Sequence, residues 1–170
     1  MRITGYRLMD RLEELQEQAK TLDGQFKSAL FQFKTEAGDK LDPRALMHAY
    51  LACEEKIARL QEAQAAYNLQ VTVSVQGEAM TLQRAVKLIG SLSHVKNAWR
   101  TAAQETPSNR YMHNIHTRDK DSEYAERMVS IAECLQLSEV ASKRVTALKQ
   151  VIRSGNATEI EIEIDPGVFA

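Results

Sequence analysis

Apolar residues recur at alternating steps of four and three along most of this chain, and this spacing constrains the fold more than any other feature. In the first segment they occupy Leu8, Leu12, Leu15, Ala19, Leu22, Phe26, Ala29 and Phe33. Steps of four and three place side chains along one face of an α-helix, in a seam close to the heptad of a coiled coil. The segment therefore predicts a long amphipathic helix that packs side by side with another helix.

A second seam of the same kind follows a polar connection at residues 35–42. Asp42 and Pro43 are a typical helix start, because aspartate caps backbone N–H groups and proline fits the first turn. The apolar side of this seam then contains Leu46, Tyr50, Cys53, Ile57, Leu60 and Tyr67. Two long helices joined by a short link favour an antiparallel hairpin, which we expect over residues 1–68.

Residues 80–155 predict a second helical hairpin. Thr81 can cap its first helix, whose apolar stripe is wide enough to predict more than one neighbour. That stripe contains Ala85, Leu88, Leu92, Val95, Trp99 and Ala102, widened by Leu82, Val86 and Ile89. The last helical stretch is expected to begin near residues 121–122 and to end at Gly155, either continuously or with a break at Ser138.

Two short runs alternate with a period of two, the pattern of a half-buried β-strand. Valines alternate with polar residues across 69–76, and isoleucines alternate with glutamates across 158–164. A strand needs a partner, so we expect these two to pair with each other, with the glutamates facing solvent. The sequence thus predicts a mainly α single domain over 1–170, with two helical hairpins, a small two-stranded β element and the order α-α-β-α-α-β.

Composition narrows the function classes. The 170 residues carry a formal net charge of −1, so no global field selects nucleic acid or an anionic membrane. No apolar run approaches the roughly 20 residues of a spanning helix, and no secretory signal is recognised. Cys53 and Cys134 are interpreted as buried free thiols of a reduced compartment. We therefore expect a cytoplasmic protein with no membrane partner and no cofactor.

Side chains suited to ligand binding concentrate in the long connection at residues 104–121. The candidate ligand-binding residues are Arg110, Tyr111, His113, His116, Arg118 and Lys120. In one interpretation they form a small-anion or nucleotide site, in which the cations hold phosphate and Tyr111 stacks on a base. A solvated loop whose charges only maintain solubility is the favoured interpretation.

A metal site is the third interpretation of the same loop. His113 and His116 would lie one helical turn apart, with Asp119 or Asp121 as a carboxylate ligand. Histidines three positions apart are common by chance, and no glutamate stands between them as in a zinc-protease helix. A metal-dependent hydrolase is accordingly the weakest of the three hypotheses.

Four segments carry a resemblance to known proteins: Tyr67 with Asn68, the valine-rich link to Gly77-Glu-Ala-Met-Thr-Leu-Gln-Arg-Ala-Val86, Arg110 with Tyr111, and the long final helix. In these segments the chain resembles the septicolysin-like family of small bacterial helical proteins. The carboxyl end departs from the family, with Asn156-Ala-Thr-Glu-Ile160 in place of a Trp-Thr-Thr motif. The resemblance implies a helical fold and brings no catalytic residue.

No Gly-rich phosphate loop, Ser-His-Asp order or paired acidic dyad is recognised, so the sequence favours no enzymatic activity. The heptad-like seams and the wide apolar face around Trp99 favour a homo-oligomeric interaction or assembly protein. Trp99 itself is expected in the core or in an interface. The alternatives are the anion or nucleotide binder, of phage or mobile-element origin, and the metal-dependent hydrolase.

Overall fold

The computed structural model describes residues 1–31, 41–105 and 127–169. Over these ranges the elements are β1 (Arg2–Ile3), α1 (Gly5–Ala29), α2 (Pro43–Gln70), β2 (Thr72–Val75), β3 (Glu78–Thr81), α3 (Leu82–Gln104), α5 (Ile131–Ala157), β4 (Ile160–Glu161) and the 3-10 helix η1 (Pro166–Val168). The mainly helical class predicted from the sequence is confirmed. No helix of the described ranges is long and apolar enough to span a membrane.

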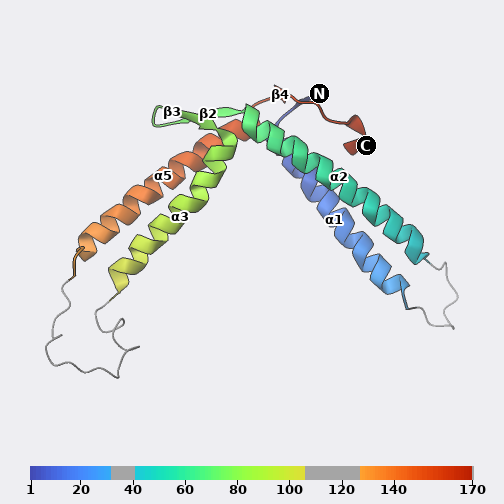
Figure 1. Cartoon of the computed structure of the whole chain (residues 1–170), viewed down its shortest axis with the longest axis horizontal. Helices are drawn as coiled ribbons and strands as arrows, with labels where there is room; N and C mark the ends of the chain where they lie inside the picture. The colour runs from blue at the N-terminus through green and yellow to red at the C-terminus, as the bar shows by residue number, and fades with distance from the viewer. Residues whose placement is uncertain (32–40, 106–126, 170) are drawn as a thin grey trace, which may run out of the picture.

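The helices form two arms that diverge from a common junction (Figure 1). The first arm is α1 packed along α2, and the second arm is α3 packed along α5. At the junction, β2 lies against α5, and the two arms make their few contacts with each other. Each arm is therefore a single layer of two helices for most of its length.

Side-chain caps set the starts of the helices, because the first N–H groups of a helix have no partner within it. The capping side chains are Thr4 for α1, Asp42 for α2, Thr81 for α3 and Ser130 for α5. The starts predicted at Asp42 and Thr81 are present. The predicted start near residues 121–122 lies outside the described residues.

Two predicted features of the last helix are wrong. Residues 127–130 are not helical, so α5 begins at Ile131 and does not continue an earlier helix. The helix also does not stop at Gly155 but continues to Ala157. Gly155 is instead buried against Val73 and Leu82, where a Cβ would lie 2.9 Å and 3.0 Å from their methyl carbons. Ser138 causes no break, and its hydroxyl donates to the Lys96 carbonyl of α3 at 3.0 Å.

The predicted pairing of the two strand runs with each other is also wrong. β2 pairs with β3 as a hairpin, and β4 pairs with β1 at the other end of the chain. Gln76 and Gly77 both have positive φ (53° and 85°), as tight hairpin turns require, so the nearest partner for β2 is the segment immediately after it. The strands are shorter than predicted, because 69–70 belong to α2 and the last run forms a strand only at Ile160–Glu161, although Ile162 still exchanges backbone hydrogen bonds with Met1.

The junction is held together by Tyr67, which is completely buried. Its hydroxyl lies 2.7 Å from the carbonyl oxygen of Gly155 and 2.6 Å from that of Thr158. The phenol thus connects the end of α2 to the end of α5. Gly5, at the start of α1, packs so closely on the same ring that a Cβ there would lie 2.8 Å from Cε1.

The segment after α5 crosses the first arm and covers the amino end of the chain. Val168 is 1% exposed, and its carbonyl accepts a hydrogen bond from Nε of Arg11 at 3.0 Å. The guanidinium of Arg7 lies 5.4 Å from the centre of the Phe169 ring, a cation–π distance. The glutamates of this segment face solvent, as the alternating pattern predicts.

Candidate functional site

The ligand-binding residues predicted from the sequence lie outside the described residues. They are Arg110, Tyr111, His113, His116, Arg118 and Lys120, together with the possible carboxylate ligands Asp119 and Asp121. The anion, nucleotide and metal hypotheses therefore stay predictions. Within the described ranges, no group of three His, Cys, Asp or Glu side chains is placed to hold a metal ion.

Arg127 links the described residues on either side of the range 106–126. Its Nη2 donates to the carbonyls of Ala102 at 2.5 Å and Glu105 at 3.0 Å, and its Nη1 donates to the carbonyl of Val129 at 3.4 Å. The last carbonyls of a helix lack partners and carry partial negative charge, so a guanidinium suits them. Arg127 thus ties the end of α3 to the segment that leads into α5, and sequence reasoning did not single it out.

The two thiols are buried and free, as predicted. Burial raises the pKa of the Cys53 thiol, and its Sγ donates to the Leu15 carbonyl at 3.3 Å. A thiol held in its neutral form is a poor nucleophile and a poor metal ligand. Cys53 is therefore a packing residue between α1 and α2.

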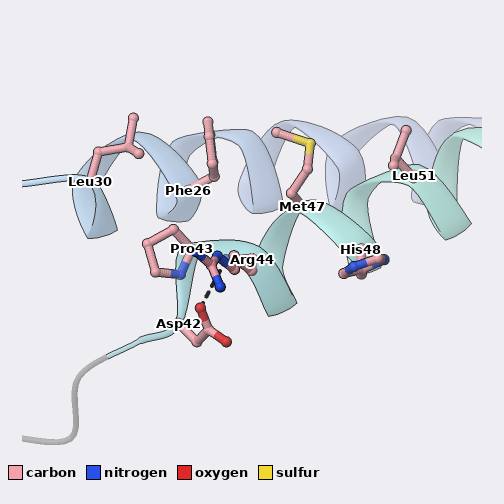
Figure 2. Close-up of a pocket in the computed structure, with 8 residues that line it drawn as sticks. All are labelled: Phe26, Leu30, Asp42, Pro43, Arg44, Met47, His48 and Leu51. Atoms are coloured by element: carbon pink, nitrogen blue, oxygen red, sulfur yellow. Dashed lines mark hydrogen bonds between the residues drawn. The ribbon is translucent and has the colours of Figure 1, made fainter.

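An open apolar pocket of about 510 Å³ lies at the far end of the first arm (Figure 2). It is lined by Phe26, Leu30, Asp42, Pro43, Arg44, Met47, His48 and Leu51. The carboxylate of Asp42 accepts a bond from the backbone N–H of Arg44 at 2.9 Å, so it serves as a helix cap. His48 is exposed. The pocket offers apolar surface, and its polar lining side chains are Asp42, Arg44 and His48.

A second apolar surface runs along the second arm. On α3 only Leu82 and Ala85, at the base of the arm, are buried. Farther along, Val95 is 44% exposed, and Leu88 and Trp99 are only half-buried. Among the described residues, the wide stripe that predicts several neighbours therefore has one neighbour, α5, along the outer part of the arm.

α5 carries a mostly apolar stripe next to the seam that contacts α3. The stripe contains Leu137, Val140, Arg144 and Ala147, which again step by three and four. Leu137 is half-buried, Val140 is 59% exposed, and Arg144 is its one charged member. This spacing is visible in the sequence, yet it was not singled out there. Spacing shows which positions share a face and not which face lacks a partner.

Two ion pairs place the stripes of α3 and α5 on the same side of the arm. Glu78 contacts Arg84 of α3 at 2.9 Å and Arg144 of α5 at 3.9 Å. Leu88 and Val95 lie four and eleven positions after Arg84, so they share its face of α3, because a helix turns about 100° per residue. For the same reason Val140 and Leu137, which lie four and seven positions before Arg144, share its face of α5. We call this surface the Val140 face, defined by Leu88, Val95, Trp99, Leu137 and Val140.

Comparison with known proteins gives one informative match. No family model and no curated protein matches this chain. The fold is similar to that of a solved structure described as a functionally unknown conserved protein from Corynebacterium diphtheriae, with a TM-score of 0.69. The match covers 95% of this chain and 100% of that chain at 15% sequence identity, so it shows a shared fold alone. The resemblance to the septicolysin-like family stays a prediction.

Proposed function

We propose that this chain is a non-enzymatic helical protein that assembles with copies of itself and acts as an interaction or assembly module. The observation that carries the proposal is the Val140 face. Soluble domains bury the apolar stripe of a helix between two packed layers, and the described part of the second arm is a single layer. Its half-buried Trp99 and the exposed Val95 and Val140 are side chains that a second layer would cover.

The dimensions of the second arm suit a specific interface. α3 has 23 residues, which gives a length of about 35 Å at roughly 1.5 Å per residue, and two adjacent helices are about 20 Å wide. One face of the arm therefore offers about 700 Å², close to the roughly 800 Å² that each partner contributes to a standard interface. Aromatic residues are enriched in such interfaces, and this face contains the only tryptophan of the chain.

Sedimentation velocity and light scattering on the intact protein test the proposal directly. At micromolar concentration we expect a species of at least twice the chain mass of 19.2 kDa, which dissociates on dilution. A strict monomer over the whole micromolar range would contradict self-assembly.

A further inference from the structure

We propose that two copies pair through antiparallel α5 helices about a two-fold axis beside residues 138–139, with Glu133 of each copy facing Arg144 of the other. The inference rests on the proposed self-assembly and identifies the surface that it uses. It concerns the Val140 face of the second arm and involves only described residues.

The spacing along α5 supports an antiparallel self-pairing. Positions 133, 137, 140 and 144 step by four, three and four, so their side chains form one stripe. A two-fold axis at the centre of this stripe brings Leu137 opposite the partner's Val140. The same axis brings Glu133 opposite the partner's Arg144. One register therefore satisfies both the apolar and the charged positions.

The charges distinguish this arrangement from a parallel one. A parallel pairing in register would place Arg144 beside its own copy, and like charges in contact repel. Within the structure Arg144 is only weakly engaged, because Glu78 approaches it at 3.9 Å and pairs more closely with Arg84 at 2.9 Å. Among the described residues, Glu133 forms no salt bridge. Both charges are therefore available to a second copy.

The pairing would also complete the layer that the second arm lacks. Two helical hairpins stacked face to face form a four-helix bundle, in which each hairpin covers the apolar stripe of the other. Val95 and Trp99 of α3 flank the α5 stripe on the same side of the arm, so the second copy would cover them too. The opposite side of α5 is less suitable, since its apolar positions Ile131 and Leu135 are followed by Ser142 and Lys149.

Val140→Glu is the direct test, with Ile131→Glu as its matched control. The two side chains are similarly exposed, at 59% and 53%, and they are nine positions apart, which is about 180° around the helix. A buried, unpaired carboxylate is costly. We therefore expect Val140→Glu to raise the dissociation constant of the dimer about a hundredfold or more and Ile131→Glu to leave it unchanged. Circular dichroism and thermal unfolding would verify that both variants are folded.

A charge swap tests the antiparallel register. Glu133→Arg and Arg144→Glu should each weaken the dimer about tenfold or more, and the double variant should recover most of the wild-type affinity. Arg144→Glu also disturbs the contact with Glu78 inside one copy. That disturbance persists in the double variant, so recovery would report the contact between copies.

The outcomes separate the two proposals. A wild-type monomer removes both of them. A wild-type oligomer that Val140→Glu leaves intact, or that Ile131→Glu dissociates instead, overturns the proposed surface while self-assembly stands. Dissociation by Val140→Glu without recovery in the charge-swapped double variant overturns the antiparallel register.

Discussion

Tyr67 and Gly5 show how little space separates the elements at the junction. The Tyr67 ring is completely buried, and its hydroxyl is shared between two carbonyls at the end of α5. A Cβ at Gly5 would lie 2.7 Å from the Asn156 side-chain oxygen, 2.8 Å from that ring and 3.1 Å from the backbone Cα of Asn156. The side-chain oxygen could move, but the buried ring and the backbone are fixed by packing, so the clash has no inexpensive relief.

We therefore expect Gly5→Ala to destabilise the fold by about 1–3 kcal/mol, the usual cost of overpacking a well-packed site. Gly90→Ala is the control, because nothing lies within 4 Å of its Cβ position in the middle of α3. Alanine there should stabilise the protein by up to about 1 kcal/mol through helix propensity. Urea unfolding of the two variants measures both effects, and equal effects of the same sign would contradict the close packing at Gly5.

Two buried acids predict a loss of stability at alkaline pH. Burial raises the pKa of the Tyr67 phenol and of the Cys53 thiol above their ordinary values. The unfolded chain therefore loses these protons first, and the stability they support is complete below the unfolded pKa values, about 8.5 for cysteine and 10 for tyrosine. It declines as the pH rises through the folded values. We expect the urea midpoint to fall above about pH 8.5.

Tyr67→Phe and Cys53→Ala supply the comparison for that pH profile. Each variant is less stable at neutral pH, because a hydrogen bond or packing contact is lost. Each should also show a shallower alkaline decline than the wild type, since one titrating group is absent. If both variants lose stability with pH as steeply as the wild type does, other groups control the alkaline transition.

At the scale of elements, the segment after α5 is held by burial more than by its ion pair. Val168 of this segment is 1% exposed, whereas Arg59 and Asp165 form a pair 2.9 Å apart with both side chains more than half exposed. We expect Val168→Ala to cost about 2 kcal/mol, from two buried methyl groups and the cavity they leave. Arg59→Ala should cost at most about 1 kcal/mol. Thermal unfolding in low and high salt distinguishes the two contributions. Salt screens the ion pair, so the cost of Arg59→Ala should fall in high salt, whereas the cost of Val168→Ala should not.

The sequence predicts elements better than it predicts their partners. The four-three spacing and the capping residues Asp42 and Thr81 locate long helices, because helix periodicity and caps are local properties. Strand pairing was wrong, since the partner of β2 follows from the turn at Gln76 and Gly77, and β1 is too short to show a period. The end predicted at Gly155 was wrong because its glycine serves a close contact with Val73 and Leu82.

The candidate site shows the same contrast between local features, which the sequence predicts, and tertiary contacts, which it does not. Reasoning from residue types directed attention to the basic loop around Arg110 and His116, which the structure does not describe. The Val140 face consists of ordinary apolar residues, which carry no chemical signature. Its exposure depends on which side of the second arm lacks a neighbour, and that is a property of tertiary structure. The heptad-like seams and the wide stripe around Trp99 were the sequence features that indicated an additional contact.

For the whole molecule, burial is unevenly distributed between the junction and the second arm. The core cluster includes Tyr67, Leu82 and Ala85 near the junction, whereas no residue of α3 beyond Ala85 is buried. Local opening follows the density of buried apolar contacts. In an isolated chain, the amides of α3 beyond Val95 should therefore exchange hydrogen faster than those near Leu82.

Self-pairing would change this pattern of hydrogen-exchange rates at one surface, the Val140 face. If a second copy covers the Val140 face, amides over residues 133–147 of α5 and 92–102 of α3 gain protection, since local opening would first require dissociation. Val140→Glu should remove that protection, Ile131→Glu should retain it, and the first arm should exchange alike in all three proteins. Hydrogen exchange measured by mass spectrometry at two protein concentrations provides the test. A protection pattern that is independent of concentration would show that the second arm is stable without a partner.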